Sequence, residues 1–361
     1  PLAILIFADF ETWRQAKKIL QFNEQVVQYG AQQTIPMPVA PYTPTTYLTR
    51  YANTQGEQFS RVKDGDTNPY AEPPTQPDLE ARKYRNEIRK TFERDGHRNF
   101  GGQYSTQVQD PMFMEPEAGL GWLDTSKQTL SLVLGTQATN GDISTTLGLF
   151  SATGCPIKVS TIELNACYPG GGFGGRDVTT FTPLLALAAA FSDGPVRIAQ
   201  DRYEQFQSGL KQLDSTVTQR LAVTHTGKLL AIQSEQKLSA GGNKNYSQFV
   251  AELAGYCGVS GYNVEQAMVD AVAMPTPGVI AGSMRGFGGP QASFAVESLI
   301  DEIAIGLKMD PIELRRRNVL HEGQRTVTGA PLTQAMRLQE ICDLAAHQTL
   351  WRNREREHKR R

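Results

Sequence analysis

Apolar and polar residues follow two patterns along the chain, one typical of strands and the other of helices. β-Branched or alternating runs bounded by turn residues predict strands at 129–134, 158–164, 196–200, 215–223 and 229–236. An apolar stripe of helical spacing, formed by Ala292, Ala295, Leu299, Ile303 and Leu307, predicts a helix over about 291–307. Because strands and helices alternate without a regular βαβ order, the pattern predicts an α+β fold.

Three further helices are predicted from the residues that begin them. Asp9 is a capping residue for a helix over about 10–20. Thr182 followed by Pro183 begins an apolar helix that continues to about residue 191. Asp310 and Pro311, with Glu313 three residues after the aspartate, form a variant of the capping box and predict a helix to about residue 320.

The first hundred residues are more irregular. The apolar run at 2–7 predicts a buried strand, and 25–29 predicts a second short strand. From about 32 to 97 the chain is rich in proline and then in polar residues, which indicates a long connection that carries at least one solvated surface helix. The last residues, 351–361, read as a charged tail that frays from a helix end.

Composition removes several classes of protein. The 361 residues carry 36 basic and 37 acidic side chains, so the net charge of −1 argues against a nucleic-acid binder. No apolar run reaches the ~18 residues of a membrane helix, and no secretory signal is visible. Four distant cysteines and five scattered histidines lack metal-ligand spacing, which predicts free, buried thiols, no metal site of the protein's own and a reducing, cytoplasmic location. The start at Pro1 suggests a processed or partial chain.

The glycine cluster at 170–175, Gly-Gly-Gly-Phe-Gly-Gly, is the densest special feature of the sequence. It satisfies the G-x-G-x-x-G dinucleotide fingerprint, but Pro169 precedes it and the next predicted helix is delayed to Pro183. Phe173 also places a bulky ring where a pyrophosphate would approach. Such a loop brings bare backbone amides close to an anion or cofactor, with one aromatic side chain as a wall. A tight turn without a ligand is the alternative.

A second loop, Met-Arg-Gly-Phe-Gly-Gly-Pro-Gln at 284–291, repeats the combination of glycines and phenylalanine. Together with 109–116 and 310–318, the two loops resemble the molybdenum hydroxylases of the xanthine oxidase and aldehyde oxidase family, in the same order from about residue 1 to 350. The resemblance implies the mixed-sheet molybdopterin-binding domain of the xanthine oxidase type, preceded by the remainder of an α/β hammerhead-like domain. It implies a partial hammerhead-like domain and connection at 1–97, a first molybdopterin-binding domain at 98–350 and a tail at 351–361.

The resemblance also implies a cofactor and site residues. Family members hold molybdenum on a pterin dithiolene and hydroxylate a carbon beside a ring nitrogen or an aldehyde carbonyl, with water as the oxygen source. By this similarity Gly171, Gly172 and Gly174 lie beside the molybdenum, and Phe173 stacks near the substrate. Gln109 is similar to the glutamine that hydrogen-bonds an oxo ligand, although Pro111 stands where the family has histidine. Gln103 follows a Gly-Gly pair but lies at the wrong distance from Glu115.

Two charged residues complete the implied site. Arg285 matches the arginine that stabilises negative charge developing on the substrate in purine hydroxylases, a role that suits a guanidinium because it stays charged. Asp177 occupies the position where xanthine-oxidising members carry glutamate and aldehyde-oxidising members an apolar residue. An acid there favours a substrate with ring N–H or amide-like groups, although aspartate is one methylene shorter.

The late segment with the family's catalytic glutamate and the main pterin-binding stretch are both absent. The resemblance therefore implies that this chain shares the molybdenum cofactor with a partner chain that carries the glutamate, while [2Fe–2S] and FAD subunits accept the electrons. The expected activity is hydroxylation of an N-heterocycle, a purine such as xanthine or hypoxanthine first. Three alternatives stay open: an aldehyde-oxidising member, a non-catalytic scaffold that keeps the fold, and dinucleotide binding at 170–175.

Overall fold

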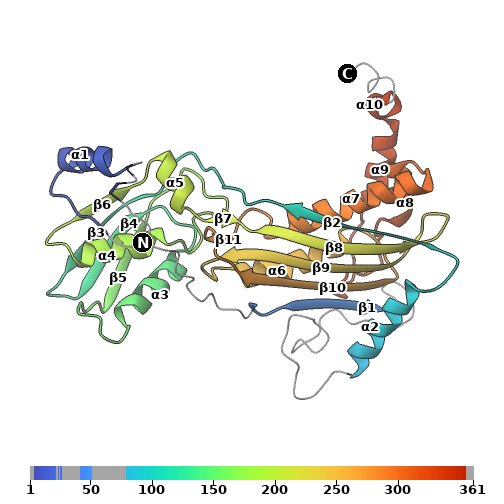
Figure 1. Ribbon diagram of the computed structural model, residues 1–361, viewed down its shortest axis with the longest axis horizontal. Helices are drawn as coiled ribbons and strands as arrows, with labels where there is room; N and C mark the ends of the chain where they lie inside the picture. Colours follow the sequence, from blue (N-terminus) through green and yellow to red (C-terminus); the bar gives the residue numbers. More distant parts are fainter. Residues whose placement is uncertain (1–3, 22, 24, 27–40, 51–78, 355–361) are drawn as a thin grey trace. The chain divides into compact units, whose positions relative to one another are not determined.

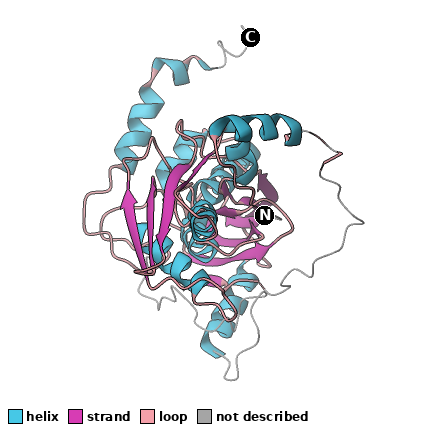
Figure 2. Cartoon of the chain, turned by 90° about the vertical axis from the view of Figure 1, so that its left-hand side faces the viewer, coloured by secondary structure: helices cyan, strands magenta, loops and turns pink. Residues whose placement is uncertain are grey.

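The computed structural model describes residues 4–21, 23, 25–26, 41–50 and 79–354. The chain forms two compact units that interleave in sequence (Figure 1). The first unit consists of residues 1–39, 110–212 and 279–285, and the second of residues 40–109, 213–278 and 286–361. Both mix helices with strands, as Figure 2 shows, so the predicted α+β class is confirmed. The predicted domain boundaries at 97 and 350 stay predictions.

The described part of the first unit is built on a four-stranded mixed sheet in the order β5-β4-β3-β6. Its strands are β3 (Ala118–Asp124), β4 (Thr129–Leu134), β5 (Thr161–Ala166) and β6 (Val196–Ala199). Two helices, α3 (Thr139–Phe150) and α4 (Phe181–Ala190), pack against it. Leu130, Leu132 and Leu185 are fully buried between the sheet and α4. This core supports the loop between β5 and α4 that carries the glycine cluster.

Smaller elements complete the first unit. Helix α1 (Phe10–Leu20) begins as predicted at Asp9, whose carboxylate accepts a 2.8 Å hydrogen bond from the Thr12 amide. Helix α5 is Arg202–Ser208, and its capping Asp201 also forms an ion pair of 2.7 Å with Lys17 of α1. Strands β7 (Lys211–Gln212) and β11 (Ala281–Gly282) pair in parallel. That pairing brings the 279–285 segment into the first unit.

The described part of the second unit contains a five-stranded sheet in the order β1-β10-β9-β8-β2. Its strands are β1 (Thr45–Arg50), β2 (Arg98–Thr106), β8 (Asp214–Val223), β9 (Leu229–Gly241) and β10 (Gln266–Pro275). The pairs are antiparallel except for β9 and β10, which are parallel. Helices α2 (Leu79–Thr91), α6 (Ser247–Tyr256) and α7 (Gly289–Leu307) pack against this sheet.

Both faces of this sheet are buried, and neighbouring residues of one strand serve different cores. Leu221, Ile232 and Val269 join one core with Leu299 and Ile303 of α7. The residues beside them, Ala222, Ala231 and Met268, join a second core with Tyr84 and Ile88 of α2. This division follows from the two-residue period of a strand, which sends successive side chains to opposite faces.

The remaining elements of the second unit follow the sheet. They are the 3₁₀ turn η2 (Cys257–Val259) and the helices α8 (Pro311–Asn318), α9 (Leu338–His347) and α10 (Thr349–Arg352). Asp310 caps α8 as predicted, because its Oδ1 accepts hydrogen bonds from the amides of Ile312 and Glu313 at 2.8 and 3.2 Å. The Glu313 side chain bonds Arg316 and Arg317, so the capping box itself is not completed. Among the described residues, no helix is long and apolar enough to cross a membrane.

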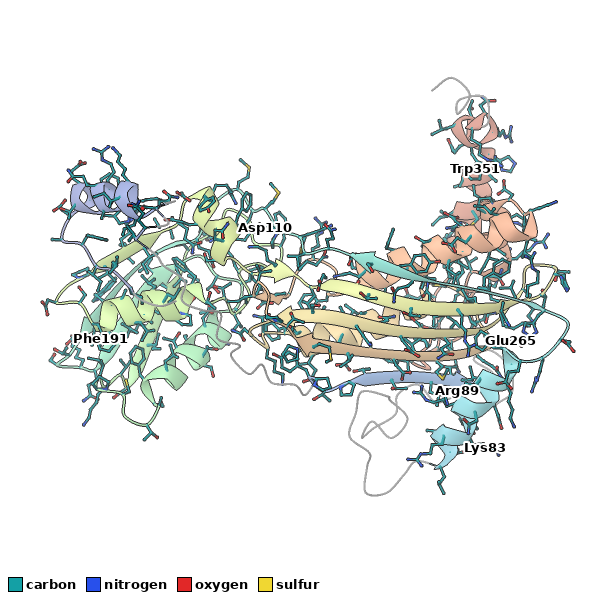
Figure 3. All side chains as sticks on the ribbon, viewed as in Figure 1. Lys83, Arg89, Asp110, Phe191, Glu265 and Trp351 are labelled. Carbon is teal, nitrogen blue, oxygen red and sulfur yellow. The ribbon has the colours of Figure 1, made fainter. Side chains whose placement is uncertain are left out.

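Helix α2 lies inside the predicted polar connection, but only one of its faces is solvated. Lys83 and Arg89 are exposed on that face (Figure 3). On the other face Arg85 is 5% exposed and forms an ion pair of 2.6 Å with Asp270 of β10. The connection thus carries a helix with a solvated face, as predicted, and its other face holds a buried arginine with its own acidic partner, which the charged sequence did not indicate.

The predicted strand at 2–7 was also wrong. Ile4, Leu5 and Ile6 are exposed, and residues 4–7 form no strand; residues 1–3 lie outside the described part. A short apolar run has no periodicity that identifies a strand or the partner it would need. For the second predicted strand, Gln25 and Val26 form a turn and residues 27–29 lie outside the described part. The four cysteines are free, as predicted, but the prediction that they are buried was wrong, because Cys167 is exposed and the other three are only partly buried.

Candidate functional site

The glycine cluster forms an irregular loop between β5 and α4 in the first unit. Gly171, Phe173 and Gly174 have φ angles of 97°, 50° and 91°. Phe173 therefore has a left-handed backbone, which costs a residue with a side chain roughly 1–2 kcal/mol, and its ring is 47% exposed. Because this backbone conformation is unfavourable, contacts with the surrounding structure must stabilise it.

The segment that ends in Arg285 supplies part of that support. The Arg285 amide donates a 2.9 Å hydrogen bond to the carbonyl oxygen of Phe173. The Ser283 hydroxyl lies 3.0 Å from the carbonyl oxygen of Gly174. A Cβ atom on Gly174 would lie 2.8 Å from the Ser283 carbonyl oxygen, so this close approach requires glycine. The structure thus brings Phe173 and Arg285, both predicted site residues, together through their backbones.

Asp177 lies at the same junction. Its Oδ2 atom is 3.1 Å from the Ser283 hydroxyl. Partial burial raises the pKa of Asp177, and the Ser283 hydrogen bond opposes that rise. The side chain of Arg285 is exposed, in contrast to the half-buried Asp177. Asp177 and the Arg285 backbone are therefore both linked to the 283–285 segment, and the Arg285 side chain makes no hydrogen bond or ion pair within the described residues.

A buried arginine supports the loop from below. The Arg176 side chain is 1% exposed and lies 4.7 Å from the centre of the Phe113 ring. Its guanidinium donates hydrogen bonds to the carbonyl oxygens of Glu115 and Gly135, the second at 3.5 Å. The Glu115 carboxylate lies 3.5 Å from the guanidinium and also accepts the Gly170 amide. Arg176 thus joins the glycine loop to two other chain segments.

Two further acids lie close to this arginine. Glu117 is 4% exposed; it accepts a 2.9 Å hydrogen bond from the Thr179 hydroxyl, and burial raises its pKa to about 7. Asp142 is 2% exposed and accepts a 2.5 Å hydrogen bond from Thr136, and burial raises its pKa as well. The positive charge of Arg176 opposes the rise at Glu117. The loop therefore rests on a layer of buried polar side chains.

Sequence reasoning missed this supporting layer. Arg176, Glu115 and Glu117 were not selected as site residues, and Gln137, which contacts the loop from the turn after β4, was also missed. Their contacts join positions up to 62 residues apart, and no local pattern encodes such pairings. The one available signal was the arginine that directly follows the double glycine at 174 and 175.

Gln109 ends the first of the three segments of the second unit and directly precedes Asp110 of the first unit, which Figure 3 labels. It is exposed, and its side chain has no hydrogen bond within the described part of the chain. Asp110 forms an ion pair of 2.9 Å with Lys211. The assignment of Gln109 to the cofactor stays a prediction. Gln103 lies in β2 and donates a 3.2 Å hydrogen bond to the Thr218 hydroxyl.

The second glycine and phenylalanine loop begins α7. Gly286, Phe287 and Gly288 have φ angles of 96°, 44° and 82°, so this phenylalanine also has a left-handed backbone. Gly286 onward belongs to the second unit, whereas Arg285 belongs to the first. The two loops therefore share a backbone conformation, with a strained phenylalanine between glycines in each.

The donor set of the loop at 170–175 fits an oxygen-rich or sulfur-rich cofactor. The amides of Gly171, Gly172 and Phe173 donate no hydrogen bond to any described residue. Consecutive free amides without bulky side chains are a common way to receive an anionic group. No group of His, Cys, Asp or Glu side chains in the described part could hold a metal ion.

The same geometry does not favour a dinucleotide. Helix α4 begins only at Phe181, after Gly175 and a further turn, so the glycines do not lead directly into a helix N-terminus. The phosphate site of the dinucleotide fingerprint needs that direct passage from loop to helix.

Comparison with known proteins identifies the family. The model of the molybdopterin cofactor-binding domain matches residues 72–319, which is more than half of the 361 residues. The chain therefore belongs to the molybdopterin cofactor-binding domain family.

Curated relatives carry names from the same group. The chain is 30% identical over 242 residues to the nicotinate dehydrogenase large molybdopterin subunit of Eubacterium barkeri, covering 67% of this chain and 56% of that protein. It is 27% identical over 223 residues to a xanthine dehydrogenase molybdenum-binding subunit of Escherichia coli, covering 62% of this chain and 29% of that protein. The chain thus spans about half, or less, of the length of these relatives.

The fold agrees with a solved structure. The aldehyde oxidoreductase of Desulfovibrio desulfuricans matches with a TM-score of 0.64 at 22% identity, over 93% of this chain and 32% of that one. The prediction of a mixed-sheet molybdopterin-binding fold, and of membership in the molybdenum hydroxylase group, is confirmed.

Proposed function

We propose that this chain forms one part of the molybdenum cofactor site of a multi-subunit hydroxylase. The single observation that carries the proposal is the loop at 170–175, where three consecutive amides have no hydrogen-bond acceptor among the described residues and the Phe173 carbonyl oxygen accepts a hydrogen bond from the Arg285 amide. When bound, the molybdenum cofactor supplies the redox centre and the transfer of oxygen derived from water. The protein has to hold that group, orient the substrate and exclude competing reactions.

Gly171, Gly172 and Phe173 receive the cofactor through their free amides, and Gly174 allows the Ser283 segment to approach. The half-exposed Phe173 ring offers a flat apolar surface against which an aromatic substrate stacks. The Arg285 guanidinium stabilises negative charge that develops on the substrate, because it remains protonated. Gln109 donates to an oxygen of the cofactor.

The substrate class that we propose is an N-heterocycle, with a purine such as xanthine or hypoxanthine first. Asp177 supports this choice, because a carboxylate accepts hydrogen bonds from the ring N–H or amide-like groups of such a substrate. The names of two relatives, a nicotinate and a xanthine dehydrogenase, agree with a heterocycle. An aldehyde is the second candidate, because a further relative is named aldehyde oxidoreductase.

The proposal includes partner chains and a cytoplasmic location. A chain with the second half of the molybdenum domain would carry the catalytic glutamate and the remaining cofactor contacts; the names of two relatives, both subunits, support a multi-subunit enzyme. Further subunits would carry [2Fe–2S] clusters and FAD. We expect these chains to co-purify with the full chain expressed in its native host.

The test is to purify that complex and measure molybdenum per chain by mass spectrometry. Turnover of xanthine, hypoxanthine, nicotinate and an aromatic aldehyde is then followed with a dye as electron acceptor. We expect molybdenum in the complex and turnover of a heterocycle. Arg285→Ala should lower kcat/KM by about tenfold to a hundredfold, which is the usual effect of losing one charge-assisted hydrogen bond.

Arg197→Ala is the matched control, because Arg197 is an exposed arginine on β6 of the same unit. It should leave turnover unchanged. Equal turnover in the Arg285→Ala complex would remove this side chain from the chemistry. A complex without molybdenum would instead favour the non-catalytic scaffold, and preference for the aldehyde would favour the second substrate class.

A further inference from the structure

Gln137 contacts the glycine loop from the turn between β4 and α3. Its side-chain Oε1 atom accepts hydrogen bonds from the amides of Gly174 and Arg176 at 2.9 and 3.3 Å. The backbone amide of Gln137 donates a 3.0 Å hydrogen bond to the backbone carbonyl oxygen of Arg176. One glutamine therefore makes three hydrogen bonds to a stretch of three residues, directly after Phe173.

These donors fix the orientation of the Gln137 amide group. Two N–H groups face one atom of the side chain, so that atom must be the carbonyl oxygen, since the Nε2 group would oppose donor to donor. An apolar side chain at position 137 would leave both loop amides without a partner. A glutamate would keep an acceptor oxygen in the same place.

The shape of the loop depends on the same contact. A Cβ atom on Gly172 would lie 2.4 Å from Oε1 of Gln137, so the glutamine fills the space that a side chain at 172 would need. Phe173 lies between Gly172 and Gly174, and its left-handed backbone must be held from outside. Gln137 holds the residues after Phe173, and Arg285 holds the Phe173 carbonyl oxygen.

We propose that Gln137 is a positioning residue, which keeps the free amides of Gly171, Gly172 and Phe173, and the Phe173 ring, in the orientation that receives cofactor and substrate. The contacts of Gln137 are with the loop backbone, so it acts through those residues. That these amides receive a cofactor rests on the function proposed above. That Gln137 fixes the conformation of the loop does not rest on it.

The first test uses hydrogen exchange of the full chain, with mass-spectrometric fragmentation to single residues. Gln137→Leu should exchange the amides of Gly174 and Arg176 at least about fivefold faster than the wild type, because each loses its acceptor. Gln137→Glu should restore wild-type protection. Gln15→Leu on the exposed face of α1 is the matched control and should leave these amides unchanged.

The second test uses the complex with its partner subunits. Gln137→Leu should lower kcat at least about tenfold with KM changed less than threefold, and Gln137→Glu should recover kcat to within about threefold. If Gln137 only filled space, leucine and glutamate would lower kcat by similar factors, because both replace the glutamine side chain. Wild-type exchange in Gln137→Leu, or a Gln137→Glu variant that behaves like Gln137→Leu, would overturn the proposal.

The two tests also separate this inference from the proposed function. A wild-type complex without molybdenum would contradict the function, and the exchange rates would still decide whether Gln137 holds the loop. A complex with molybdenum and unaltered exchange in Gln137→Leu would support the function and contradict the positioning role.

Discussion

Glu117 is a buried acid in the layer of polar side chains that contacts the glycine loop. It is buried, hydrogen-bonded to Thr179 and near Arg176, yet its pKa is raised to about 7 because the loss of hydration outweighs these partners. An acid in this position is charged or neutral depending on the pH of the cell. Its ionisation therefore alters the stability of the unit that holds the loop.

The sign of this effect can be stated. An ordinary glutamate titrates near 4.5, so between about 4.5 and 7 the folded chain binds more protons than the unfolded chain. The free energy of unfolding should then fall as the pH rises through this window, by up to about 1.4 kcal/mol per pH unit. Glu117→Gln should remove this slope, measured as urea midpoints at several pH values.

The control is Glu163→Gln, an exposed glutamate on β5, which should keep the wild-type slope. A Glu117→Gln variant with an unchanged pH dependence would show that another group governs this range.

At the scale of single residues, the sequence indicated the parts of the candidate site that lie in glycine-rich loops. Phe173 and Arg285 could be selected because glycine, phenylalanine and arginine recur in two short motifs. Gln137 and Arg176 could not, because what matters is their distance to backbone atoms elsewhere in the chain. A glycine-rich loop can be found from the short spacing of its own residues. The side chains that support it come from distant positions and follow no such spacing.

At the scale of elements, caps and continuous apolar stripes were the most informative signals. They predicted α1, α7 and α8 to within about two residues, and the β-branched run predicted β4 at its observed bounds. The strand β10 was missed because it is buried along most of its length and therefore shows no alternation. Whether such a buried segment forms a strand or a helix is decided by its tertiary contacts.

The cap of α8 gives a prediction at this scale. Asp310 accepts two backbone amides of α8, and its second oxygen accepts from Trp351 and Arg354 at 3.3 and 2.9 Å. Asp310→Ala should lower the free energy of unfolding by about 1–2 kcal/mol through loss of the cap. Thermal unfolding followed by circular dichroism measures the change.

Asp310→Asn keeps an acceptor oxygen and should lose much less. If alanine and asparagine destabilise the protein equally, the charge toward Arg354 rather than the cap carries the stabilisation.

At the scale of the whole molecule, each unit has a core of its own. The core of the first unit gathers side chains from 130 to 196, and the two cores of the second unit lie on opposite faces of its sheet. No buried residue of these clusters belongs to both units. The chain crosses between the units several times, but each hydrophobic interior is separate.

Separate interiors predict separate losses of protection. Leu185→Ala in the first unit removes a fully buried side chain and should destabilise that unit by about 2–5 kcal/mol. Amides of β3 and β4 should then exchange faster, while those of β8 and β9 keep their protection. Ile300→Ala, a fully buried residue of α7, is the reciprocal variant and should show the reverse.

Equal loss of protection in both units with either variant would contradict this independence. Hydrogen exchange of the full chain at matched pH provides the comparison.

The two-sided sheet of the second unit has a consequence for how this sequence can change. Within β8, β9 and β10, neighbouring apolar residues belong to opposite interiors: Leu221 and Ala222, Ala231 and Ile232, and Met268 and Val269. Deleting a single residue ahead of one of these pairs would exchange their sides, sending Leu221 or Ile232 to the side that now holds Ala222 or Ala231. Length changes should therefore be tolerated in this sheet only in steps of two, or in the connections between its strands.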